Sequence, residues 1–138
     1  MLIDTRLTFS ASQALTASAA STDRIDLETD RDIGPGRTLY LVMNVEVAAD
    51  ATTGNETYQV TLQTDTSGSF PSPADLVTRA IDAGDLSAGS LHVIPVPLTN
   101  ERFLRVYYTL GGTTPSMTVT TWLTDQEPQA WRALPGAL

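Results

Sequence analysis

The stretch TLYLVMNVEVAA, residues 38–49, decides the fold class of this chain. Its apolar residues recur at every second position, and more polar ones stand between them. Successive side chains of a β-strand point to opposite faces, so this spacing predicts a half-buried strand of unusual length. The positions expected to face the core are Leu39, Leu41, Met43, Val45 and Val47.

Three further runs repeat the same alternation: TYQVTLQT (57–64), FLRVYYTL (103–110) and SMTVTTWLT (116–124). They are rich in β-branched and aromatic residues, which favour a pleated, half-buried surface. The expected inward sets are Tyr58, Val60 and Leu62; Leu104, Val106, Tyr108 and Leu110; and Met117, Val119 and Leu123. The opposite faces carry Phe103, Arg105 and Tyr107 in one run and Trp122 in another.

Turn-forming residues separate these runs. Residues 51–56 (ATTGNE) and 110–116 (LGGTTPS) each lie between two strong strands, and we interpret both as hairpin connections. Residues 65–75 form a longer loop with two prolines, and Phe70 is expected to anchor it in the core.

Two segments leave alternatives open. Residues 74–83 fit either a short helix or a strand, and we favour the strand because every clear neighbouring element is β. Residues 90–98 are apolar but contain Pro95 and Pro97, which cannot donate to a sheet ladder. This second segment is therefore expected to form an edge strand.

The chain of 138 residues has the size of a single domain. Seven or eight strands joined by Gly-, Pro- and Asn-rich turns predict an all-β, antiparallel β-sandwich over residues 1–138. The Cys–Trp–Cys pattern of immunoglobulin domains is absent, which favours a jelly-roll-like topology. We expect extended N- and C-terminal arms, the latter over residues 126–138.

Charge and composition narrow the classes of partner. The formal net charge is −8, and all eight basic residues are Arg. An acidic protein repels phosphate, so we expect no nucleic-acid or membrane partner. Neither a secretory signal nor a transmembrane run is apparent, so we expect a soluble protein.

Catalytic chemistry has little support. His92 is the only histidine, there is no cysteine, and neither a GxSxG elbow nor a Gly-rich phosphate loop occurs. We therefore expect a protein that is not an enzyme and that uses no cofactor.

Four acidic residues that alternate along the chain form a candidate calcium site. Asp26, Glu28, Asp30 and Asp32 share one face of an extended chain. However, the sixth position of an EF-hand loop requires Gly, and here it is Arg31. We favour a solvated polar face with ion pairs, and we predict no metal site.

Aromatic and Arg side chains are the residues that carry interface energy. Phe103, Arg105 and Tyr107 alternate on the face opposite the expected core set, and Trp122 does the same in its own run. Trp131 and Arg132 lie in the expected C-terminal arm. These six residues are the candidate protein interface.

Several strings, in this order and spacing, resemble one known family. The best-matching are QALTASAASTDRIDL (13–27), RDIGPG (31–36) and NERFLRVYY (100–108), followed by the final strand. From Ile3 to Leu123 the chain resembles the small jelly-roll capsid cement (decoration) proteins of tailed bacteriophages.

The resemblance implies a structural virion protein on the outer surface of the capsid, made in the cytoplasm of the bacterial host. It implies the major capsid protein as partner, self-association as a homodimer or homotrimer, and reinforcement of the shell. The alternative is a non-catalytic carbohydrate-binding β-sandwich module, in which Trp122 and Tyr107 would together form a stacking platform.

Overall fold

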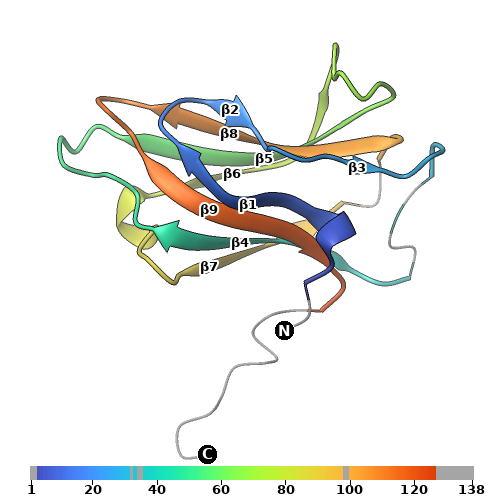
Figure 1. Cartoon of the computed structure of the whole chain (residues 1–138), viewed down its shortest axis with the longest axis horizontal. Helices are drawn as coiled ribbons and strands as arrows, with labels where there is room; N and C mark the ends of the chain where they lie inside the picture. The colour runs from blue at the N-terminus through green and yellow to red at the C-terminus, as the bar shows by residue number, and fades with distance from the viewer. Residues whose placement is uncertain (1–2, 32, 34–35, 98–99, 127–138) are drawn as a thin grey trace, which may run out of the picture.

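The computed structural model describes residues 3–31, 33, 36–97 and 100–126. These residues form two antiparallel sheets packed face to face, which confirms the predicted β-sandwich (Figure 1). The strands are β1 (Thr8–Leu15), β2 (Ala19–Ala20), β3 (Ile25–Asp26), β4 (Leu39–Val47), β5 (Thr57–Asp65), β6 (Ala74–Ile81), β7 (Leu91–Val96), β8 (Phe103–Gly111) and β9 (Met117–Thr124).

The strand pairing is that of a jelly roll. The first sheet has the order β1-β9-β4-β7, and the second has β2-β8-β5-β6, with β3 also pairing with β8. The pairs are nested: β1 with β9, β2 and β3 with β8, β4 with β7, and β5 with β6. A long two-stranded ribbon folded over on itself gives this nesting, which is the jelly-roll arrangement.

Both connections interpreted as hairpins are crossovers between the sheets, so that prediction is wrong. Residues 48–56 lead from β4 in the first sheet to β5 in the second, and residues 112–116 lead from β8 back to β9. Turn-forming residues mark a reversal of the chain, but they do not say which sheet the next strand joins. The two crossovers are hydrogen-bonded to each other, because the Thr113 N–H donates to the side-chain oxygen of Asn55 at 3.0 Å.

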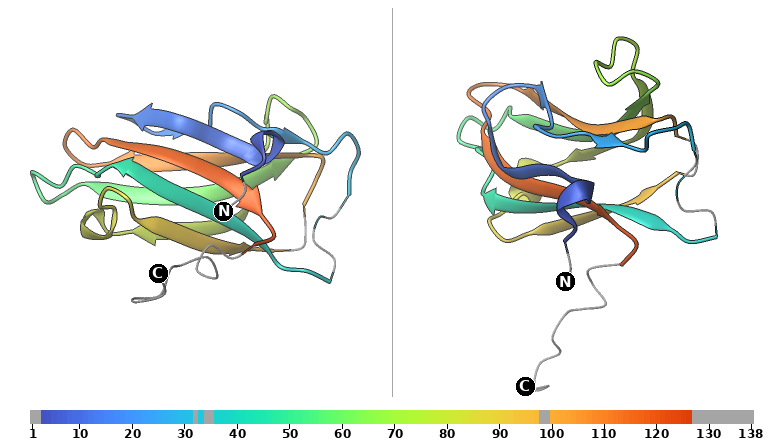
Figure 2. Two further views of the ribbon diagram at one scale, coloured as in Figure 1. Left: turned by 60° about the horizontal axis from the view of Figure 1, so that its bottom comes forward. Right: turned by 45° about the vertical axis from the view of Figure 1, so that its right-hand side comes forward.

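Two short 3-10 turns complete the structure. The first, η1 (Thr5–Leu7), precedes β1, and the Asp4 carboxylate accepts the Arg6 N–H at its start. Both views in Figure 2 place η1 near the end of β9. The second, η2 (Ala83–Asp85), follows β6.

Residues 74–81 are a strand, as favoured, and the proline-bearing β7 lies at a sheet edge. The inward sets of β5 and β8 are buried. The alternation predicts that Val47 lies in the core, but it is 58% exposed, because β4 bulges between Val45 and Val47 where it pairs with β9.

The core fills the space between the sheets. Phe9 and Met43 from the first sheet and Leu62 and Tyr108 from the second are fully buried in it. Among the described residues, no helix is long and apolar enough to cross a membrane.

Candidate functional site

The outer face of the second sheet carries a cluster of arginines stacked on aromatic rings. Strand β8 supplies Phe103, Arg105 and Tyr107 because its alternate residues, Leu104 and Val106, face the core. Two side chains from the segments that flank β3 and β8, together with Phe70 from the β5–β6 loop, complete the cluster. We call it the Arg–aromatic surface; its members are Arg24, Phe70, Arg102, Phe103, Arg105 and Tyr107.

Phe103 lies under two guanidinium groups. The guanidinium carbon of Arg102 is 4.8 Å from the ring centroid, and that of Arg24 is 5.7 Å from it. Guanidinium over an aromatic face is an attractive cation–π arrangement. These contacts explain why Phe103 is only 9% exposed although it points away from the core.

Arg105 is held between two rings and an amide. Its guanidinium carbon is 4.4 Å from the centroid of Phe70 and 5.5 Å from that of Tyr107. Its Nε donates to the Gln63 side chain at 2.9 Å, and Gln63 in turn donates to Asp75 at 2.9 Å. The guanidinium is therefore oriented by residues from three neighbouring strands, β8, β5 and β6.

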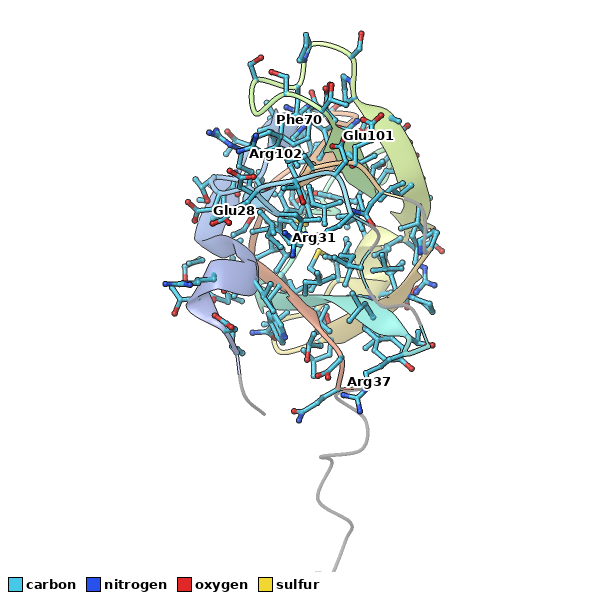
Figure 3. The ribbon with its side chains drawn as sticks, turned by 90° about the vertical axis from the view of Figure 1, so that its right-hand side faces the viewer. Glu28, Arg31, Arg37, Phe70, Glu101 and Arg102 are labelled. Atoms are coloured by element: carbon cyan, nitrogen blue, oxygen red, sulfur yellow. The ribbon has the colours of Figure 1, made fainter. Side chains whose placement is uncertain are left out.

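Phe70 is buried, as expected, but not in the core. It belongs to a loop that folds back over the outside of the second sheet, and it packs beneath Arg105. Figure 3 views the sandwich from one end. Phe70 and Arg102 lie near each other at the top of this view, and Arg37 lies at the bottom. The prediction that Phe70 anchors the loop is confirmed, but the anchoring surface is the outer face.

The Asp65 carboxylate fixes this loop. It is 3% exposed and accepts the backbone N–H groups of Ser67 and Ser72, each at 3.0 Å. The hydrogen bond from Ser67 and the further bonds from Ser72 and Thr66 stabilise the charged form, and they lower the pKa of Asp65 despite its burial. The loop is thus tied back at both ends around one carboxylate, which places Phe70.

One ion pair borders the surface. The Arg102 guanidinium donates to both carboxylate oxygens of Asp26, at 2.8 and 3.1 Å. This pairing, together with the Glu28 N–H, lowers the pKa of Asp26. Asp26 is therefore held in an ion pair with Arg102.

In the described ranges, no three acidic or imidazole groups come together as metal ligands. Asp32, the fourth member of the acidic row, lies outside those ranges.

Trp122 lies on the other sheet. It pairs with Val42 across β9 and β4, alternates with the core-facing Thr121 and Leu123, and is only 2% exposed. The structure does not bring it together with Tyr107, so the aromatic platform of the carbohydrate-binding alternative is not formed. Trp131 and Arg132 lie outside the described residues.

His92 contacts one hydroxyl group, that of Ser90. It lies on the edge strand β7, where burial lowers its pKa, and its Nε2 is 3.3 Å from the Ser90 hydroxyl. That hydroxyl donates its proton to the Ser87 carbonyl at 2.7 Å, so the proton is not directed at the ring.

The described part of the chain has, among others, two hollows of contrasting polarity. One, of about 420 Å³, is polar and lies between Arg24 and Arg105. The other, of about 510 Å³, lies at the end of the sandwich where β1 begins and β9 ends. Its apolar lining consists of Ile3, Leu7, Leu27, Ile33, Leu39 and Leu123.

The alternation along residues 103–110 predicts that Phe103, Arg105 and Tyr107 share one face, and the structure confirms that grouping. It missed Arg24, Arg102 and Phe70, which come from other segments. The string NERFLRVYY does place Arg102 beside Phe103, but no periodicity links Arg24 or Phe70 to β8.

Comparison with known proteins gives one family. The Bbp16 family model matches residues 9–121, from the second residue of β1 to the middle of β9. Comparison with curated proteins finds no match. The family match spans nearly the whole sandwich and well over half of the 138 residues, and the chain therefore belongs to the Bbp16 family.

Proposed function

We propose that this protein is a capsid decoration (cement) protein of a tailed bacteriophage. It binds the outside of the assembled head and reinforces contacts between major capsid proteins. The Arg–aromatic surface carries the proposal, because it presents interface-forming residues on the outer face of a rigid sheet. The jelly-roll pairing and the strings that resemble cement proteins support the same reading.

The function is binding, not catalysis. A standard interface buries about 800 Å² per partner, roughly a tenth of the 7610 Å² that this chain exposes. Each contact is modest, and a homodimer or homotrimer on a regular lattice gains avidity from simultaneous attachment. The net charge of −8 keeps the protein apart from packaged DNA and suits the outer capsid surface.

The test is co-sedimentation of the purified protein with phage heads that lack it. We expect saturable binding of the wild-type chain and binding roughly tenfold weaker for Tyr107→Ala. Tyr40→Ala is the matched control, since Tyr40 alternates with the core residues of β4 and lies on the outer face of the other sheet. It should bind like the wild type.

Two outcomes would contradict the proposal. If wild-type protein ignores heads but is retarded by a polysaccharide in affinity electrophoresis, the carbohydrate-binding alternative is correct. If Tyr107→Ala and Tyr40→Ala bind heads equally well, the interface does not lie on the Arg–aromatic surface.

A further inference from the structure

Two arginines of the Arg–aromatic surface form no ion pair within the part of the chain that the structure describes. The chain carries sixteen acidic residues against eight arginines. Yet among the described residues only Arg37 and Arg102 form ion pairs, with Asp125 and Asp26. The guanidinium of Arg24 instead lies over the Phe103 ring, and that of Arg105 lies over the Phe70 ring.

Stacking leaves the hydrogen-bonding edge of a guanidinium free. The aromatic ring occupies the flat face, whereas the N–H groups point outward in the plane as a fork that matches a carboxylate. Arg105 uses its Nε to donate to Gln63, and its two terminal nitrogens donate to no described residue. Arg24 makes no side-chain hydrogen bond within the described ranges. Each therefore retains donors for a ligand.

Arg24 and Arg105 both line the same polar hollow, which has a volume of about 420 Å³. Phe70 and Gly68 form part of its wall, and the Gly68 position is so close that an added Cβ would lie 3.1 Å from Arg24 Nε. The Arg105 guanidinium is thus held by Phe70 and Gln63 before any ligand arrives, and Arg24 is confined on one side by Gly68. Fixing Arg105 in advance reduces the entropy lost on binding.

The charges around the hollow select the ligand. Asp23 and Asp26 also line it, and Asp26 is already neutralised by Arg102. Because Asp26 is paired with Arg102, the lining charges that remain are Asp23 against Arg24 and Arg105, which leaves a single uncompensated positive charge. A single carboxylate balances it, whereas a phosphate dianion would leave excess negative charge beside Asp23.

We propose that this hollow receives an Asp or Glu side chain of a protein partner between Arg24 and Arg105. The inference rests on the proposed function in so far as it takes that partner to be the capsid shell. The Arg–aromatic surface then recognises an acidic loop, with the half-buried Tyr107 supplying apolar contact area and the two guanidinium forks supplying specificity for a carboxylate.

Carboxylate binding in the hollow is tested in the absence of phage heads, with the full chain and two short peptides. Tetraglutamate and tetraglutamine, both with blocked ends, are titrated into the labelled protein and followed by NMR. We expect tetraglutamate to shift the side-chain N–H signals of Arg24 and Arg105 saturably, and tetraglutamine to leave them in place. Equal shifts with both peptides would overturn the inference.

A double variant supplies the second arm. Arg24→Gln/Arg105→Gln should lose the response to tetraglutamate and bind heads roughly tenfold or more weakly. Arg6→Gln/Arg31→Gln removes the same charge from two exposed residues elsewhere, and it should behave like the wild type. Circular dichroism checks that both fold.

The outcomes separate the two proposals. If the wild type and the Arg24/Arg105 variant bind heads equally, the carboxylate pocket is wrong and the decoration function stands. If the wild type responds to tetraglutamate but never binds heads, the pocket stands and the decoration function is wrong.

Discussion

The hydroxyl of Tyr108 lies 2.7 Å from that of Thr121, and this hydrogen bond joins the two sheets through the core. Tyr108 belongs to β8 and Thr121 to β9, and both side chains are completely buried. The Tyr108 hydroxyl also lies 2.7 Å from the Ser10 hydroxyl on β1. One phenol therefore links the second sheet to two adjacent strands of the first.

Replacing Tyr108 by Phe should lower the free energy of unfolding by about 1–3 kcal/mol, because it leaves the buried Thr121 hydroxyl without this partner. The measurement is the midpoint of urea-induced unfolding, compared between variants whose unfolding free energy has the same dependence on urea concentration. Tyr107→Phe is the matched control, since the adjacent Tyr107 is only half-buried and its hydroxyl bonds to no described residue. Equal midpoints for the two variants would show that the bridge contributes nothing.

The same phenol predicts an alkaline limit to stability. Burial raises the pKa of Tyr108 to about 12, above the value near 10 of an exposed tyrosine. The unfolded chain releases this proton first, so stability is complete below about pH 10 and falls as the pH rises toward 12. The wild type should lose more stability over this range than Tyr108→Phe does. Parallel pH profiles of the two proteins would contradict the assignment.

Asp65 predicts the opposite, acidic, dependence. Its pKa in the folded chain is lowered by the Ser67 and Ser72 N–H groups. The unfolded chain binds the proton first, so the stabilisation is present above the ordinary Asp pKa of about 3.9 and is lost as the pH falls through the lower folded value. Asp65→Asn should flatten the acid side of a melting-temperature profile. Parallel acid limbs for the wild type and Asp65→Asn would contradict the assignment.

How far the sequence determines this fold is clearest at the strands and their connections. Alternation identified β4, β5, β8 and β9, because a strand buried on one face must repeat every two residues. It did not reveal that the connections at 51–56 and 110–116 are crossovers, since strand pairing depends on contacts distant in sequence.

The candidate site, too, is only partly predictable from local sequence. Strand β8 alone places Phe103 and Arg105 together, whereas Phe70 reaches them only through a loop tied to Asp65.

Trp122 shows a related limit. Alternation correctly places it opposite Leu123, but it does not tell whether that face meets solvent. The neighbouring Val42 is also fully buried on this face of the first sheet. Periodicity defines which residues share a face, and burial of the second face depends on packing that no local pattern encodes.

Gly112 tests the contact between the two crossovers. Its φ is +90°, and a Cβ there would lie 2.3 Å from the Asn55 carbonyl oxygen. Gly112→Ala therefore combines backbone strain with a backbone clash, and we expect a loss of more than about 2 kcal/mol in unfolding free energy. Gly54→Ala has a similar φ of +81° but open space around it, and it should cost only about 1 kcal/mol. Equal costs in urea titrations would show that the clash is relieved by movement of the crossovers.

Removing residues 127–138 tests whether the chain end acts in assembly. The core residues of the described sandwich extend only to Leu123, and β9 ends at Thr124, so the truncated protein should keep its circular dichroism spectrum and its urea midpoint. The apolar hollow lined by Leu7, Leu39 and Leu123 lies where the described chain ends, at Gln126. We expect truncation to weaken self-association or head binding. Trp131→Ala should reproduce the effect, because Trp131 is the largest apolar side chain of the predicted C-terminal arm. Truncation that unfolds the protein would instead place Trp131 in the core, and truncation that leaves both fold and binding intact would remove the arm from the mechanism.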